Sequence, residues 1–129
     1  MAVGLSSANL ANSWLNMLRG TAFTAPAGTF VKLHTADPGA AGATAASANT
    51  TRVSATFSAA SAGVLTMSNT PTWAAWASGS ETLTHISVWD ASTAGNFLYS
   101  VALTTSKSVT NGDTFTLSSH TFTLSPIAA

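Results

Sequence analysis

Side chains capable of acid-base chemistry are few in this chain, and they are spread along its length. The histidines and carboxylates are His34, His85, His120, Asp37, Glu81, Asp90 and Asp113. A Ser-His-Asp triad or a His/Asp metal site can be assembled from these residue types on paper. None of them, however, stands in a nucleophile elbow, a His-Glu-x-x-His helix or a glycine-rich phosphate loop. We therefore expect no catalytic residue, no cofactor-binding residue and no metal ligand.

Three of the aspartates stand in sequences typical of turns. Asp37 precedes a Pro-Gly pair, Asp90 opens a run of small and polar residues, and Asp113 follows an Asn-Gly pair. Each is predicted to accept hydrogen bonds from nearby backbone N–H groups. His34 and His85 alternate with apolar residues and are expected to make structural hydrogen bonds. A pH-sensitive or metal-bridged subunit contact is the alternative for them.

Six large side chains are candidates for contacts with a partner or for stacking on a sugar ring. They are Trp14, Met17, Trp73, Trp76, Trp89 and Tyr99. Aromatic residues dominate the cores of chains poor in charge, so Trp73 and Trp76 are interpreted first as core residues. Trp89 is expected to cover one end of a β-sandwich. An open ring beside amides or carboxylates would instead favour a ligand.

Charged residues are scarce in this composition. They make up 6% of the chain, against roughly 25% in ordinary domains, while 46% of residues are hydrophobic. The formal net charge is zero, which argues against nucleic acid and anionic membranes as partners. No run approaches the roughly 20 apolar residues of a membrane-spanning helix. We infer that much of the exterior contacts other protein copies, with an alanine- and threonine-rich coding habit as the alternative.

Length and cysteine usage narrow the class further. The 129 residues predict one domain over 1–129, large enough to bury roughly two-thirds of its unfolded surface. There is no cysteine, which excludes disulfides and thiolate sites. The first residues lack the basic and apolar regions of a signal peptide, so synthesis in a cytoplasm is expected.

One helix is predicted over residues 6–19. Ser6 and Ser7 are candidate N-caps, and Gly20 is suited to end the helix. Its apolar stripe consists of Leu10, Trp14, Met17 and Leu18. This stripe is expected to lie across the β body, with docking on a neighbouring subunit as the alternative.

The rest of the chain predicts short antiparallel strands. Period-two alternation on both sides of the turn 90–96 indicates a long hairpin over 82–103. Further strands are expected at 30–34, 52–57, 64–68, 114–117 and 121–125, together with a type I′ turn at Asn111-Gly112. Core-facing parity changes between Leu117 and Phe122, and Leu124 follows Phe122, so residues 118–120 must bulge or bend. Residues 40–51 are small and aperiodic, and are expected to form a flexible or extended loop that a partner would order.

These patterns predict a mainly β fold. We expect an antiparallel β-sandwich, jelly-roll-like, over 29–125, preceded by one N-terminal α-helix. An up-and-down barrel is the alternative architecture.

Three segments, in this order, match blocks that recur in a known protein family. They are Leu33-His34-Thr35-Ala36-Asp37-Pro38-Gly39, then Thr84-His85-Ile86-Ser87-Val88-Trp89-Asp90-Ala91 with the later pair Gly95-Asn96, and finally Val109-Thr110-Asn111-Gly112-Asp113-Thr114. Together they resemble small bacteriophage virion proteins that are variously labelled head decoration, minor tail or tail fibre proteins. Segment 40–51 departs from the more charged connection of that family.

The resemblance implies a non-enzymatic virion structural protein made in the bacterial host cytoplasm. Capsid decoration is the preferred interpretation, because the chain is short and has neither a coiled-coil stalk nor a fibrous repeat. The alternative is a minor tail or tail fibre protein acting as a carbohydrate-binding module on the host surface. Expected partners are further copies of the chain, as a trimer, and other virion proteins such as the major capsid or tail proteins.

Overall fold

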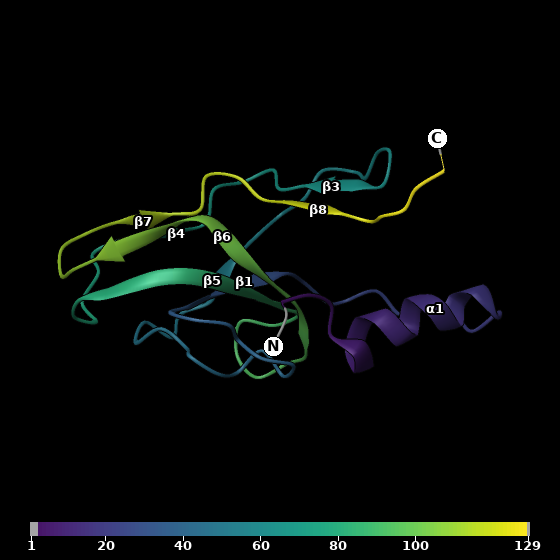
Figure 1. Cartoon of the computed structure of the whole chain (residues 1–129), viewed down its shortest axis with the longest axis horizontal. Coiled ribbons are helices and arrows are strands. Elements are labelled where there is room, and N and C mark those ends of the chain that lie inside the picture. Colours follow the sequence, from purple (N-terminus) through teal and green to yellow (C-terminus); the bar gives the residue numbers. More distant parts are fainter. Residues whose placement is uncertain (1–2, 129) are drawn as a thin grey trace.

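The central element is an antiparallel hairpin of β5 (Glu81–Trp89) and β6 (Phe97–Val109) (Figure 1). The computed structural model describes residues 3–128. The hairpin predicted over 82–103 is confirmed, and β6 continues for six residues beyond it. A register shift between Leu83 and His85 changes the strand's parity. Leu83 on one side of this bulge and Ile86 and Val88 on the other are therefore all buried.

The hairpin belongs to a four-stranded antiparallel sheet. Its order is β2-β1-β5-β6, where β1 is Phe30–His34 and β2 is Val53–Ser54. The N-terminal segment Gly4–Ser6 adds to the β6 edge, because the Ser6 N–H donates to the Leu98 carbonyl at 2.7 Å and the Ser100 N–H donates to the Gly4 carbonyl at 2.9 Å. Two distant parts of the chain thus flank the hairpin.

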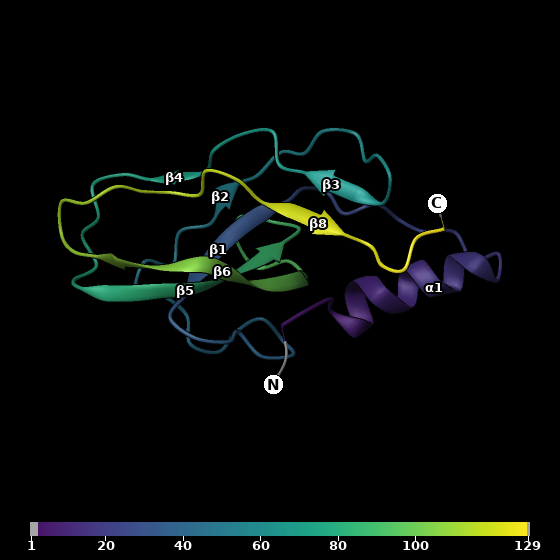
Figure 2. The same ribbon diagram turned by 45° about the horizontal axis from the view of Figure 1, so that its top comes forward.

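A second layer lies over one face of this sheet (Figure 2). It contains two antiparallel pairs, β3 (Val64–Thr66) with β8 (Thr121–Thr123) and β4 (Thr72–Trp73) with β7 (Phe115–Thr116). Backbone hydrogen bonds also join Met67 to His120 and Leu117 to Pro71, both at 2.9 Å, so the pairs form one interrupted ribbon. The register slips by one residue between the two pairs, which is the irregularity predicted at 118–120.

Segment 53–58 connects the two layers. β2 pairs with β1 in the main sheet, while Phe57 bridges to Met67 in the second layer. Ala55 between them is buried, and Asn69 bonds the backbone on both sides, accepting from the Thr56 N–H and donating to the Ser54 carbonyl. The chain turns a corner from one sheet to the other, as strands do at the closed side of a sandwich.

The layers enclose one hydrophobic core. Its buried members include Leu33, Leu83, Ile86 and Val88 from the main sheet, facing Trp73, Phe115 and Leu117 from the second layer. The mainly β, antiparallel fold with one N-terminal helix agrees with the prediction. The strand order does not follow the chain order, unlike that of an up-and-down barrel.

Two predicted strand details are wrong. Asn111-Gly112 does not close a hairpin, because β6 pairs with β5 and β7 pairs with β4. A type I′ turn needs positive φ at both central residues, and here only Gly112 has it. Leu124, expected to face the core, is 44% exposed because β8 ends at Thr123.

The loop 35–51 packs against the face of the main sheet that the second layer leaves open. Ser47, buried in this loop, donates from its backbone N–H to the Leu33 carbonyl, and its hydroxyl hydrogen-bonds the Glu81 carboxylate. Gly42 is also buried, with φ of 68° and its Cα against the Phe97 ring. The expectation of a loop ordered only by a partner is therefore corrected. Small residues let it approach the sheet of its own chain closely.

The helical segment starts as a π-turn, η1 (Ser7–Ala11), and continues as α1 (Asn12–Leu18). The Ser6 hydroxyl caps it by accepting from the Asn9 N–H at 3.2 Å, and the Gly20 N–H closes it on the Met17 carbonyl. Only the first half of the predicted stripe meets the core. Met17 and Leu18 are exposed because α1 extends past the end of the sheets (Figures 1 and 2).

We predict that Gly42→Ala destabilises the fold much more than Gly79→Ala. Both glycines have positive φ, so each substitution carries backbone strain of order 1 kcal/mol. A Cβ at Gly79 meets nothing within 4 Å, whereas a Cβ at Gly42 would lie 2.2 Å from the Phe97 ring. Thermal unfolding should show Gly42→Ala lowering Tm by at least twice as much as Gly79→Ala. Equal shifts would contradict the docking of this loop on its own sheet.

Candidate functional site

The three turn aspartates cap turns, as predicted. Asp37 accepts from the backbone N–H two residues on at 2.8 Å, and Asp113 from the N–H three residues back at 2.9 Å. Asp90 accepts from the backbone and side-chain amides of Asn96, at 2.6 and 2.8 Å. Within residues 3–128, no three His, Asp or Glu side chains are grouped so that they could hold a metal ion.

His34 is the most deeply buried titratable group of the main sheet. Its Nδ1 lies 2.9 Å from the Thr44 carbonyl, so Nδ1 carries the proton and donates. Nε2 must then accept, and the Ser87 hydroxyl donates to it at 2.7 Å. The Trp89 Nε1–H in turn donates to the same hydroxyl at 2.8 Å. This polar chain resembles a nucleophile-base pair, but Ser87 and His34 are both 0% exposed and cannot meet a substrate.

Burial sets the proton affinity of this histidine. Desolvation lowers the pKa of His34 below its ordinary value, and nearby Lys32 and His85 lower it further, against the raising effect of the hydrogen bonds to the Thr44 and Ala45 backbone. The neutral form therefore dominates near neutral pH. Structural hydrogen bonding is its role in this chain.

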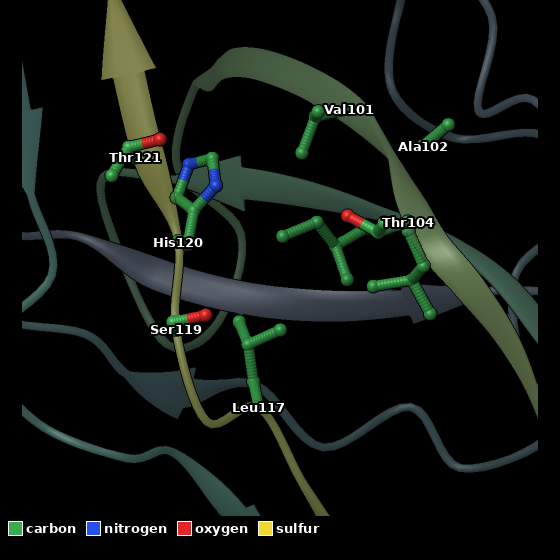
Figure 3. Close-up of a pocket in the computed structure, with 9 residues that line it drawn as sticks. Val101, Ala102, Thr104, Leu117, Ser119, His120 and Thr121 are labelled. Carbon is green, nitrogen blue, oxygen red and sulfur yellow. The ribbon is translucent and has the colours of Figure 1, made fainter.

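A pocket of about 230 Å³ opens where β6 faces the segment before β8 (Figure 3). Ser119, His120 and Thr121 follow one another along one wall, and β6 forms the other. His120 Nε2 lies 2.9 Å from the Tyr99 hydroxyl, and burial lowers the pKa of His120. No carboxylate lines the pocket, so the acidic member of a Ser-His-Asp triad is missing beside Ser119 and His120.

The aromatic candidates fall into two groups. Trp73, Trp76 and Tyr99 are at most 6% exposed. The indole N–H groups of Trp73 and Trp76 donate to the carbonyls of Thr51 and Gly79, at 2.9 and 3.0 Å. Tyr99 stacks on His120 with ring centroids 5.7 Å apart, and burial raises the pKa of its hydroxyl. These three rings are therefore buried and do not form an exposed stacking platform.

Trp89 is half-buried at the end of β5. The Arg52 guanidinium lies over its ring, with Cζ 4.0 Å from the centroid, and Lys32 Nζ lies 5.9 Å from the same centroid. Arg52 is held by two hydrogen bonds from Nη1 to the carbonyls of Ala91 and Ala94, at 3.0 and 2.5 Å. Sequence reasoning named Trp89 but missed both cations. The only signal in the sequence was that cationic residues are scarce. Lys32 and Arg52 come together at Trp89 because β2, β1 and β5 are neighbours in the sheet.

Trp14 and Met17 lie on the helix but in different surroundings. Trp14 packs edge-on against Phe23 and Phe122, at 6.4 and 6.1 Å, beside an apolar cavity of about 210 Å³ between helix and sandwich. Met17 is 52% exposed. The structure thus brings Trp14 to the subunit's own body and leaves Met17 outside it.

The exposed large hydrophobic side chains of residues 3–128 gather at one end of the protein. The set, here called the apolar end, consists of Leu15, Met17 and Leu18 on α1 and Leu124 and Ile127 on the C-terminal tail. Figures 1 and 2 both place this tail at the same end of the protein as α1. Large exposed apolar groups gathered in one region are typical of interaction surfaces. No helix in the described part of the chain is long and apolar enough to span a membrane.

Comparison with known protein families gives a match over most of the sequence. The family model described as Podophage GP4 fiber I protein gp80 matches residues 6–125, which is nearly the whole chain. No curated protein matches it at a significant level.

We predict that the protein loses stability on acidification as the pH falls below about 6.5. The folded pKa values of His34 and His120 are lowered, so in this window the unfolded chain binds more protons than the folded one. The free energy of unfolding must then fall with falling pH. Tm measured from pH 7.5 to 5 should decrease, and less so in His120→Phe, which keeps a ring on Tyr99 but cannot titrate. A Tm that is independent of pH in the wild type would contradict the lowered pKa values of His34 and His120 in the folded protein.

Proposed function

This chain belongs to the family of the Podophage GP4 fiber I protein gp80 and is a phage structural protein of the virion, and we propose that it is a non-catalytic, fibre-type subunit on the tail side of the particle. The observation that carries the proposal is the match of a fibre family over residues 6–125. The β-sandwich supports it as a rigid scaffold, and the buried Ser87-His34 pair offers no accessible nucleophile.

Capsid decoration is a second candidate. It is favoured by a compact β body with few charges and no fibrous repeat, which suits a cap on a lattice. Particles labelled with an antibody against this chain and imaged by electron microscopy would separate the two roles. Label on the tail region supports the fibre role, and label spread over the head supports decoration.

We further propose that the subunit assembles with copies of itself, as a trimer, through the apolar end. Leu15 and Leu18 are 63% and 84% exposed and one helical turn apart, so they lie on one side of α1. Arg19, the only charged residue of the helical segment, follows α1 at its C-cap. Burying these side chains between subunits removes apolar area from water at roughly 25 cal/mol per Å².

The double substitution Leu15→Glu with Leu18→Glu should abolish self-association without unfolding the subunit. Both side chains are exposed, so Tm of the subunit should change by no more than a few degrees, corresponding to less than about 1 kcal/mol. Sedimentation velocity at micromolar concentration measures the assembly state. A matched control places two glutamates on exposed positions of β6, Thr104→Glu with Ser106→Glu, and should assemble as the wild type does.

A monomeric wild-type protein would contradict the assembly proposal. So would a control variant that dissociates as fully as the helix variant, because the loss would then reflect charge alone.

A further inference from the structure

Two of the four cationic side chains of this protein lie over one indole ring. Arg52 and Lys32 both approach Trp89, at 4.0 and 5.9 Å from the ring centroid. Burial lowers the pKa of Lys32, and the neighbouring Arg52 lowers it further. Bringing two like charges together in a nearly uncharged protein raises the free energy of the folded state unless an anion joins them.

No carboxylate of the described chain acts as the anion that joins Lys32 and Arg52. Asp37, Asp90 and Asp113 accept hydrogen bonds within their own turns, and Glu81 accepts them from Ser47 and Ala48 of the loop 35–51. Asp90 is near enough to favour the charged form of Arg52, but both of its oxygens are bonded to Asn96. Neither cation forms an ion pair within residues 3–128.

The Arg52 guanidinium is held in place and has one edge available to pair with a planar anion. Nη1 is used to fix the side chain on the Ala91 and Ala94 carbonyls. Nε and Nη2, which form the other edge of the guanidinium, donate to no group in the described chain. That edge carries two parallel N–H groups with the spacing of a carboxylate or phosphate.

A hollow of about 350 Å³ adjoins the same ring. Trp89 and Phe97 supply apolar surface to it, and Ser7, Asn9 and Asn96 supply hydroxyl and amide groups. Such a mixture is what a sugar residue contacts, with its C–H face on apolar atoms and its hydroxyls on polar ones. The hollow is separate from the apolar end, so assembly and ligand binding are tested independently.

We propose that Lys32, Arg52 and the hollow beside Trp89 form a binding site for an acidic saccharide. Arg52 pairs with the carboxylate through Nε and Nη2, Lys32 adds the second positive charge, and the sugar ring lies in the hollow. Trp89 holds the two cations and borders the hollow, rather than offering an open face for stacking. This deepens the proposed fibre role by naming a ligand class for it.

The test is affinity electrophoresis of the native protein in gels containing polygalacturonate, a polysaccharide of carboxylated sugars. Wild-type protein should be retarded by polygalacturonate and not by neutral dextran, and added salt should weaken the retardation. Lys32→Gln and Arg52→Gln should each raise the apparent Kd at least tenfold. Lys107→Gln, which removes an exposed cation of β6 away from this ring, is the matched control and should bind as the wild type does.

Lys32→Gln leaves the Arg52 contacts to Ala91 and Ala94 in place, so its result stands even if Arg52→Gln loosens the turn. Circular dichroism and Tm check that each variant is folded. Absence of retardation in the wild type would overturn the proposal, as would an equal loss in Lys107→Gln. Equally tight binding of polyglutamate, which has the carboxylates without the sugar rings, would overturn the saccharide assignment.

Discussion

The hydrogen-bonded chain from Trp89 through Ser87 and His34 to the Thr44 carbonyl places polar groups in the interior of a nearly uncharged protein. Each donor meets one acceptor along it, which removes the cost of one to several kcal/mol per unpaired buried group. Because every group in this series of hydrogen bonds has a partner, the loop 35–51 can pack over the face of the main sheet that carries His34 and Ser87. Strand β5 then has cover on both faces, and the second layer packs against a fixed surface.

The buried polar side chains and the carboxylates are likewise engaged in hydrogen bonds within the protein. Within residues 3–128, no buried side-chain nitrogen or oxygen lacks a hydrogen-bond partner. The carboxylates accept hydrogen bonds from turns and from the loop 35–51, and within residues 3–128 none of them forms an ion pair with Lys32 or Arg52. The exterior that results is mostly small, hydroxyl-bearing and neutral, and it has two distinct features, an apolar end and a pair of cations on one ring. A surface of this kind suits a protein that works in contact with other molecules.

Local signals in the sequence were reliable where neighbouring residues decide the structure. The aspartate caps, the central hairpin and the helix start all follow from short patterns, and so does the irregularity after Leu117. The features that depend on contacts distant in sequence could not be predicted from local patterns. Asn111-Gly112 has the composition of a hairpin turn, yet pairing with β4 takes β7 away from β6. Lys32 lies on β1, Arg52 directly precedes β2 and Trp89 ends β5, and only the sheet order reveals that these three positions are neighbours.

The N-terminal segment has a consequence for how the protein is made. Gly4–Ser6 is hydrogen-bonded to Leu98–Ser100, so the edge of the main sheet is assembled from residues more than ninety positions apart. On a ribosome this edge stays open until residues 98–100 have left the exit tunnel, and β1 cannot pair with β5 until residues 81–89 have done so. Contacts so distant in sequence slow the search for the native pairing. The helix, which follows that segment directly, is therefore positioned only after residues 98–100 have been synthesised.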